Sequence, residues 1–140
     1  MVVTEIVESR LKLLEEYRND LREYESMELA DYRRDKKTQR FVERTLQLAI
    51  EACIDIASHI VSAEGFREAK DNKDLFVILS EQGILSTELL PAMMDMCKFR
   101  NIIVHDYTRI DPEIVIGILR RNLKDFDSFS KEIGKYIYAA

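Results

Sequence analysis

The stretch ERTLQLAIEACIDIASHI, residues 43–60, decides the fold of this chain. Its apolar residues recur at intervals of three and four, which is the period of an α-helix. An apolar face this wide indicates a helix that packs inside a bundle instead of lying on a sheet. The spacing predicts a helix from about residue 33 to residue 63. Its central apolar line is Val42, Leu46, Ala49, Cys53, Ile56 and Ile60, widened by Ile50, Ala57 and Val61.

The segments on either side also show helical spacing. We expect a long helix over about residues 4–26 and a short one over about residues 73–82, which ends at Gly83. A further helix begins after Ser86 or Thr87, and a last one begins at Asp111-Pro112 and runs on as one element. No strand pattern of convincing length occurs. The prediction is an all-α fold, an up-and-down helical bundle of four main helices plus one short helix.

The composition bounds the class of protein. The 140 residues suffice for a single domain, 1–140, and the apolar content of 46% suffices for its core. The net charge of −5 argues against a protein that coats nucleic acid non-specifically. No apolar run approaches the roughly 20 residues that span a bilayer, and the amphipathic N-terminus lacks the features of a signal peptide. We therefore expect a cytoplasmic protein with no membrane partner.

The two cysteines and the scarcity of metal-binding patterns bound the chemistry. Cys53 and Cys97 both lie in apolar segments, so we expect two buried reduced thiols, with a disulfide as the alternative. Cysteines, histidines and carboxylates nowhere show the spacing of a metal site. The sequence therefore predicts neither a metal nor a cofactor.

A second stretch, KFRNIIVHDYTRIDPE, residues 98–113, gathers an arginine, a histidine and a tyrosine in a chain with only two histidines. It lies in a locally basic region, because residues 98–124 contain six bases against three acids. The ordinary interpretation is a polar helix end. A cation there complements the helix dipole, the histidine caps the helix or lies at the surface, and Tyr107 packs at the turn.

The run RNIIVHDY, residues 100–107, resembles the Arg-x-x-x-x-His-x-Tyr signature of the HEPN superfamily, in particular its HepT branch. Residues 43–60 look like the second helix of that branch, and residues 109–129 look like its last helix. The resemblance implies a cytosolic ribonuclease toxin with Arg100 and His105 as its catalytic residues. It also implies an antitoxin partner, a minimal nucleotidyltransferase (MNT), that can modify Tyr107 with AMP.

The residue chemistry agrees with this resemblance. RNA can be cut without a metal when its own 2′-hydroxyl attacks the adjacent phosphate. This reaction needs a base, an acid and positive charge on the phosphoryl oxygens. Histidine can take either proton role near neutral pH, and arginine presents a permanently charged fork to phosphate.

One chain does not supply enough of these groups. On a straight helix, Arg100 and His105 are separated by about 7.5 Å of rise and about 140° of rotation, so they cannot easily converge on one phosphate. The other histidine, His59, belongs to a distant helix and is better interpreted as a core or margin histidine. We therefore expect a composite site in a homodimer, in which the two copies of His105 share the acid and base roles.

Two residues are candidates for supporting roles. Asp55 lies among apolar neighbours, and it either pairs with Arg100 or remains solvated at the margin of the apolar face. Asn101 either orients His105, four residues on, or bonds to the helix end.

A competing hypothesis for the whole chain is a non-catalytic accessory subunit of a minimal nucleotidyltransferase, in which Arg100 and His105 bind a nucleotide without cutting RNA. An inert helical scaffold is a third.

Overall fold

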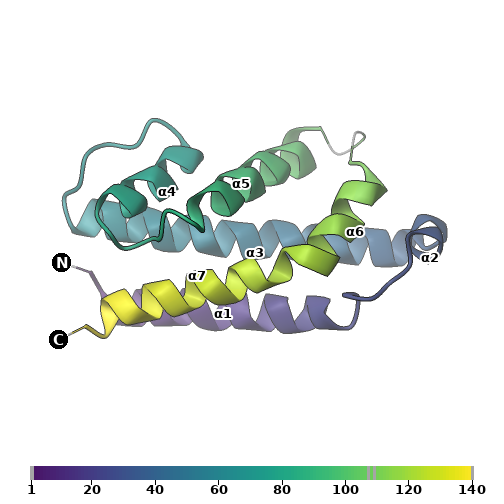
Figure 1. Ribbon diagram of the computed structural model, residues 1–140, viewed down its shortest axis with the longest axis horizontal. Coiled ribbons are helices and arrows are strands. Elements are labelled where there is room, and N and C mark those ends of the chain that lie inside the picture. The colour runs from purple at the N-terminus through teal and green to yellow at the C-terminus, as the bar shows by residue number, and fades with distance from the viewer. Residues whose placement is uncertain (1, 107, 109, 140) are drawn as a thin grey trace.

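The computed structural model describes residues 2–106, 108 and 110–139, and over these residues the chain forms seven helices and no strand (Figure 1). The prediction of an all-α helical bundle is confirmed. The helices are α1 (Thr4–Arg22), α2 (Leu29–Arg34), α3 (Lys36–Ala63), α4 (Asn72–Glu81), α5 (Leu90–His105), α6 (Pro112–Arg121) and α7 (Leu123–Ile137).

The long helix α3 is the centre of the bundle. In Figure 1, α1 and α7 run along one side of it, and α4 and α5 follow one another along the other side. Both α1 and α5 run antiparallel to α3 and pack against it. Every residue of the apolar line predicted for α3 is buried, together with Ile50, Ala57 and Val61. By length and composition α3 could cross a membrane, but 56% of its most apolar window is buried inside the bundle, as expected for a core helix.

Several helix boundaries differ from the prediction: α1 ends at Arg22 and α5 begins at Leu90, and two further differences have a clear side-chain cause. The carboxylate of Asp35 accepts a hydrogen bond from the backbone N–H of Thr38, 3.1 Å away, so Asp35 caps α3 and separates it from α2. The expectation of one continuous last helix is wrong, because the chain breaks at Asn122 between α6 and α7. The Asn122 side chain donates a hydrogen bond to Asp125, 3.0 Å away, and such local bonds compete with helix continuation.

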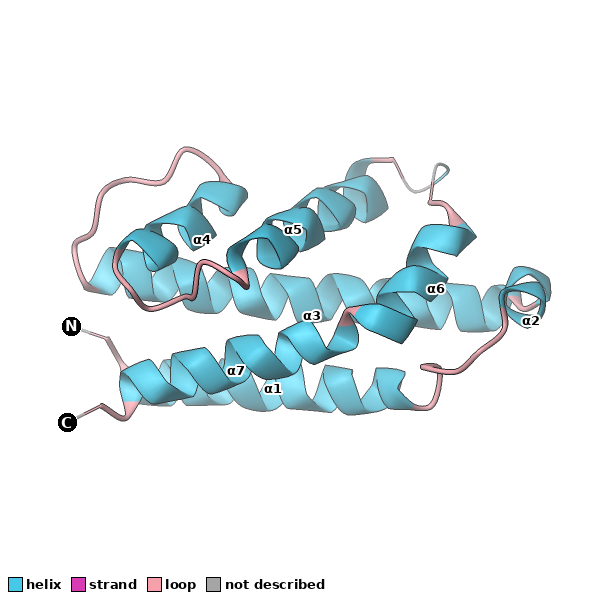
Figure 2. Cartoon of the chain, viewed as in Figure 1, coloured by secondary structure: helices cyan, strands magenta, loops and turns pink. Residues whose placement is uncertain are grey.

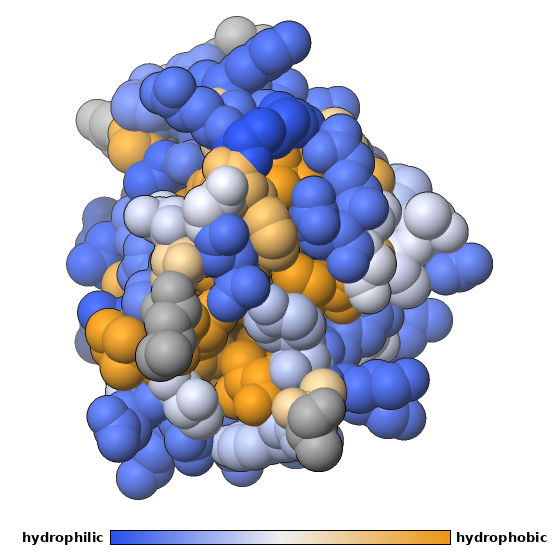
Figure 3. Space-filling view, turned by 90° about the vertical axis from the view of Figure 1, so that its left-hand side faces the viewer, coloured by the Kyte–Doolittle hydropathy of each residue, from blue (hydrophilic) through white to orange (hydrophobic). Residues whose placement is uncertain are grey.

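The remaining connections are loops (Figure 2). Residues 64–71 form the connector between α3 and α4. Arg67 fixes this loop by ion pairs with Asp74 at 2.8 Å and Glu81 at 2.9 Å, both on α4. Figure 3 shows the end of the bundle where both termini emerge, with polar residues over most of it and apolar residues visible between them.

The two cysteines are buried and unpaired, as the sequence predicts. Burial raises the pKa of the Cys97 thiol to about 12 and raises that of Cys53 well above its ordinary value. Both thiols are therefore neutral members of the core between α3 and α5.

Candidate functional site

The side chain of Arg100 is held against α3 by a carboxylate. Its Nε and Nη2 lie 3.0 Å and 2.9 Å from the same oxygen, Oε2 of Glu51. Gln47, one turn earlier on α3, donates a hydrogen bond to that oxygen over 3.2 Å. The two charged side chains are 23% and 29% exposed, so the pair is partly shielded from water. Glu51 thus fixes one edge of the guanidinium.

The packing of α5 brings this pair together. Phe99 and Ile103, on either side of Arg100, are buried and anchor the C-terminal half of α5 against the core. Arg100 therefore emerges at the seam between α5 and α3, where Glu51 faces it. Its remaining nitrogen, Nη1, donates a hydrogen bond to Asn101 over 3.3 Å. A guanidinium has five N–H donors, so this arrangement leaves donors for an anion.

His105 is the last residue of α5, and it is exposed. With Lys98 and Asn101 it forms the solvent-facing line of this helix, at spacings of three and four residues. The helix remains regular up to this point, because the backbone N–H of Asp106 still bonds to the carbonyl of Ile102 over 2.8 Å. The two side chains therefore point in directions about 140° apart around α5, as expected for a regular helix. Within one chain, the structure does not bring them together.

The hypothesis that Asp55 pairs with Arg100 is wrong. Asp55 lies one turn further along α3, 59% exposed, with Arg10 of α1 at 3.8 Å. The alternative, a solvated carboxylate at the margin of the apolar face, is confirmed. The carboxylate that does hold Arg100 is Glu51, one turn earlier on the same helix. In the sequence, Glu51 is recognisable only as a polar residue beside the predicted apolar line. The spacing within α3 does not show which side of that helix α5 covers.

The other candidates have clear places or lie outside the described residues. Asn101 bonds to Arg100, and no bond between Asn101 and His105 is formed. His59 accepts a hydrogen bond from the backbone N–H of Val3 over 3.0 Å, which confirms it as a satisfied margin histidine. Tyr107, the expected AMP acceptor, lies outside the described residues.

Three apolar side chains are exposed around the end of α5. Ile102 and Val104 of α5 are 37% and 38% exposed, and Ile114 of α6 is 50% exposed. In the described part of the chain, no group of three His, Cys, Asp or Glu side chains could hold a metal ion. The region around Arg100 and His105 thus offers cations, an imidazole and uncovered apolar surface.

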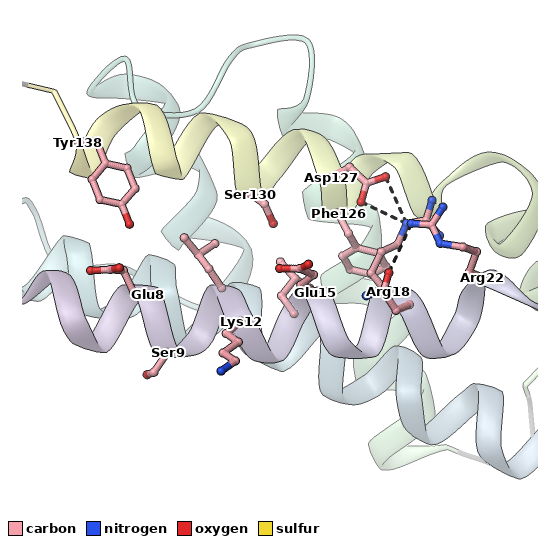
Figure 4. A pocket seen from close by; sticks show the side chains of 13 residues that line it. Glu8, Ser9, Lys12, Glu15, Arg18, Arg22, Phe126, Asp127, Ser130 and Tyr138 are labelled. Carbon is pink, nitrogen blue, oxygen red and sulfur yellow. Dashed lines mark hydrogen bonds and ion pairs between the residues drawn. The ribbon is translucent and has the colours of Figure 1, made fainter.

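A broad pocket of about 690 Å³ lies elsewhere, between α1 and α7 (Figure 4). Its most buried polar side chain is Arg18 of α1, which is 8% exposed. Arg18 bonds to Asp127 of α7 over 3.2 Å and to Glu25 over 2.6 Å, so its charge is satisfied within the fold. None of the predicted site residues lines this pocket, and its arginine joins α1 to α7.

Comparison with known proteins agrees with the signature in α5. Residues 14–133 match the family model described as "Ribonuclease HepT-like". The tRNA nuclease HepT of Aphanizomenon flos-aquae is 33% identical over 132 residues, which cover 94% of this chain and 90% of that protein. The mRNA nuclease HepT of Shewanella oneidensis is 32% identical over 100 residues, covering 71% of this chain and 75% of that protein.

A solved structure shows the same architecture. The tri-AMPylated HEPN toxin of Shewanella oneidensis, in complex with an MNT antitoxin, superposes with a TM-score of 0.86 at 26% sequence identity. The alignment covers 94% of this chain and 98% of the toxin. Fold, signature and sequence similarity along most of the chain coincide, and this chain therefore belongs to the HepT-like ribonuclease family.

Proposed function

We propose that this ribonuclease is the toxin of a toxin–antitoxin pair and cuts RNA internally without a metal, with Arg100 and His105 as its catalytic residues. The observation that carries the proposal is the fixed guanidinium of Arg100, held by Glu51 over 2.9 Å and 3.0 Å on the helix that ends in an exposed histidine. These two residue types supply the charge and the proton transfers that the reaction requires.

The reaction follows from the chemistry of RNA. One imidazole takes the proton of the 2′-hydroxyl, and the 2′-oxygen forms a bond to the adjacent phosphorus. The bond from phosphorus to the 5′-oxygen breaks, and a second, protonated imidazole gives its proton to that oxygen. The products are a 2′,3′-cyclic phosphate and a free 5′-hydroxyl. The guanidinium of Arg100 stabilises the negative charge on the phosphoryl oxygens.

The two imidazoles come from two chains in this proposal. Within one chain, His105 points about 140° away from Arg100 around α5, and His59 is bonded at the far end of α3. A two-fold homodimer would place both copies of Arg100 and His105 in one cleft. The exposed Ile102, Val104 and Ile114 support such an interface, because a second copy could cover them.

The proposed partner is a nucleotidyltransferase antitoxin of the MNT type, and the proposed compartment is the cytoplasm. Support comes from the Shewanella oneidensis HEPN toxin, which is tri-AMPylated and complexed with an MNT antitoxin. In this chain the acceptor would be Tyr107, two residues after His105. AMP there would add bulk and negative charge where an RNA phosphate must bind, and would inhibit by repulsion.

The catalytic proposal is tested with purified protein and RNA in excess EDTA. We expect cleavage that leaves 2′,3′-cyclic phosphate ends, and we expect it to be lost in Arg100→Ala and in His105→Ala. His59→Gln is the matched control, since it alters the other histidine of the chain. Cleavage that survives His105→Ala contradicts the proposal, and a wild type that leaves RNA intact would favour the accessory-subunit hypothesis.

The antitoxin proposal has its own test. Co-expression with the nucleotidyltransferase encoded next to this chain should add the mass of one or more AMP groups to the tryptic peptide that contains Tyr107. Tyr107→Phe should abolish that mass shift and leave the toxin active. An unmodified peptide, or a modification that persists in Tyr107→Phe, argues against Tyr107 as the acceptor.

A further inference from the structure

One side of the first half of α3 is strongly basic. Lys36, Lys37, Arg40 and Arg44, which we call the α3 basic strip, are all exposed. In the part of the chain that the structure describes, no ion pair engages any of the four. The preceding arginines differ, because Arg33 pairs with Glu113 at 3.4 Å and Arg34 pairs with Asp31 at 2.7 Å.

The strip is aligned with the candidate site. At about 100° per residue, its four residues lie within about 60° of the direction of Glu51 around α3. Glu51 points toward α5, since it bonds to Arg100. The strip therefore faces the same side of α3 as Glu51. It covers about 12 Å of helix, and Lys36 lies about 22 Å from Glu51 along the axis.

The strip also begins where α5 ends. Because α5 runs antiparallel to α3 (Figure 1), the direction from Arg100 to His105 leads toward the N-terminus of α3. His105 lies about 7.5 Å along that direction, whereas Arg44 lies about 10.5 Å from Glu51 along α3. A strand that leaves Arg100 along α3, toward the end of α5, would meet Arg44 first and then Arg40.

The segment of residues 33–44, which contains the α3 basic strip, is basic in a chain that is acidic as a whole. Residues 33–44 contain six bases and two acids in a protein of net charge −5. Both acids have local roles. The carboxylate of Asp35 binds the hydroxyl of Thr38 over 2.7 Å and its backbone N–H over 3.1 Å. Glu43 is half-buried near Tyr32, and burial raises the pKa of its carboxyl. A row of cations at one-turn intervals suits a polyanion better than a compact anion.

We propose that the α3 basic strip binds the backbone phosphates of the RNA strand on one side of the cleaved bond. The proposal rests on the proposed ribonuclease function and assigns a further part of the same substrate to this chain. Contacts of this kind supply affinity and position, and they carry no base specificity of their own.

The test measures binding of a 20-nucleotide single-stranded RNA to the full chain carrying His105→Ala, which prevents cleavage. In that background, Arg40→Gln with Arg44→Gln removes two charges. Each phosphate contact with a single strand contributes about 0.7 to the slope of log K against log salt, so the slope should fall by about 1.4. In the cleaving protein, the same pair should raise KM severalfold and leave kcat unchanged.

Two further variants are the controls. Lys131→Gln with Lys135→Gln removes two exposed charges from α7 at the same four-residue spacing, and it should leave the slope and KM unchanged. Arg40→Lys with Arg44→Lys keeps the charge and should keep the slope. The thermal midpoint of each variant establishes that it is folded.

Several outcomes would overturn the proposal. An unchanged slope in Arg40→Gln/Arg44→Gln contradicts it, and so does an equal loss in the α7 pair. A loss confined to binding of the nucleotidyltransferase partner would assign the strip to a protein instead of RNA. Because the strip variants are compared with a chain that cleaves RNA through Arg100 and His105, failure of the ribonuclease proposal would appear separately, as no cleavage in the parent protein.

Discussion

The side chain of Arg100 bonds to a carboxylate of its own chain and, in our proposal, also binds a phosphate of the substrate. Glu51 Oε2 accepts a hydrogen bond from its Nε and forms an ion pair with its Nη2, and Asn101 accepts a hydrogen bond from its Nη1. An arginine side chain has about 2 kcal/mol of rotamer entropy, and a partner that orders it in advance reduces what substrate binding must order. The pair is only 23% and 29% exposed, so water screens it less than an open surface pair.

Glu51→Ala should therefore lower kcat and leave KM unchanged or reduced. Without the carboxylate, the guanidinium loses its fixed position, and misplacement of a catalytic group costs roughly tenfold to a hundredfold in rate. The negative charge beside the phosphate site also disappears, which favours RNA binding. Steady-state kinetics on a short RNA measures both constants. Glu51→Gln keeps an acceptor oxygen for Arg100 and should retain more activity than Glu51→Ala.

Asp55→Ala is the matched control for this prediction. Asp55 is a carboxylate on the same helix, one turn further on, but it is exposed and pairs with Arg10. Its loss should leave both kinetic constants unchanged. A higher KM at constant kcat in Glu51→Ala would contradict the positioning role, because it would mean that Glu51 contributes to binding alone.

The thiol of Cys97 should be unreactive in the folded protein. Burial raises its pKa to about 12, against about 8.5 for an exposed thiol, so almost no thiolate exists at pH 8. Mass spectrometry after treatment with iodoacetamide at pH 8 should find no adduct on the native chain and two adducts in denaturant. The folded state keeps this proton where the unfolded state loses it. The contribution of the Cys97 thiol to the free energy of unfolding is therefore complete below about pH 8.5 and declines as the pH rises toward 12. Rapid alkylation of the native chain would contradict this.

At the residue scale, the catalytic role of Arg100 and His105 stays a prediction from the sequence, and the carboxylate that the sequence suggested for Arg100 was the wrong one. Asp55 stands among apolar residues, which favours a buried, paired group. In the structure its side chain is exposed and lies near Arg10 of α1. Glu51 faces α5 only because the loops and α4 place α5 along one particular side of α3. Spacing within a helix defines relative directions, and only the packing of a second helix decides which direction becomes a site.

Among the elements, α3 was the most predictable because its apolar line is long and unbroken. Two of the helix boundaries that differed depend on single side chains. Asp35 ends α2 by capping α3, and Asn122 interrupts the final segment between two apolar stretches that both continue the helical period. Because periodicity continues across such a break, the pattern predicts one helix where the chain forms two.

Gly117→Ala should stabilise α6. Glycine costs about 1 kcal/mol relative to alanine inside a helix. An added Cβ would approach only the far end of the Arg121 side chain, at 2.6 Å from Nη2. That side chain is exposed and can move, so the gain in helix propensity should exceed the cost of displacing it. We expect Tm to rise by about 3 °C in a thermal unfolding experiment.

Gly83→Ala is the opposite case and the control. Gly83 has a φ of +72°, which residues other than glycine adopt only with strain. Space is not the obstacle, because an added Cβ would have no atom within 4 Å. The variant should lower Tm. If Gly117→Ala lowered Tm as well, the Arg121 side chain would be needed where it lies.

For the whole molecule, the arrangement of the bundle supports our proposal that one chain is an incomplete catalyst. Its helices fix Arg100 at the seam with α3 and leave His105 on the outer face of α5. The apolar residues around that helix end are uncovered in the single chain. The shared cleft that we propose, with two copies of each residue, would account for both features and would make activity depend on the composition of the dimer.

Mixing active and inactive chains tests this dependence. Wild type and His105→Ala, refolded together in equal amounts, should give wild-type homodimers as about a quarter of all dimers. If both copies of His105 act on one RNA, the mixed dimer lacks an acid or a base. Total activity should then fall to about a quarter of that of an all-wild-type sample at the same total concentration. Chains that act independently would retain about half. Mixing with His59→Gln is the control and should preserve full activity. A linear decline with the wild-type fraction would show that each chain carries a complete site.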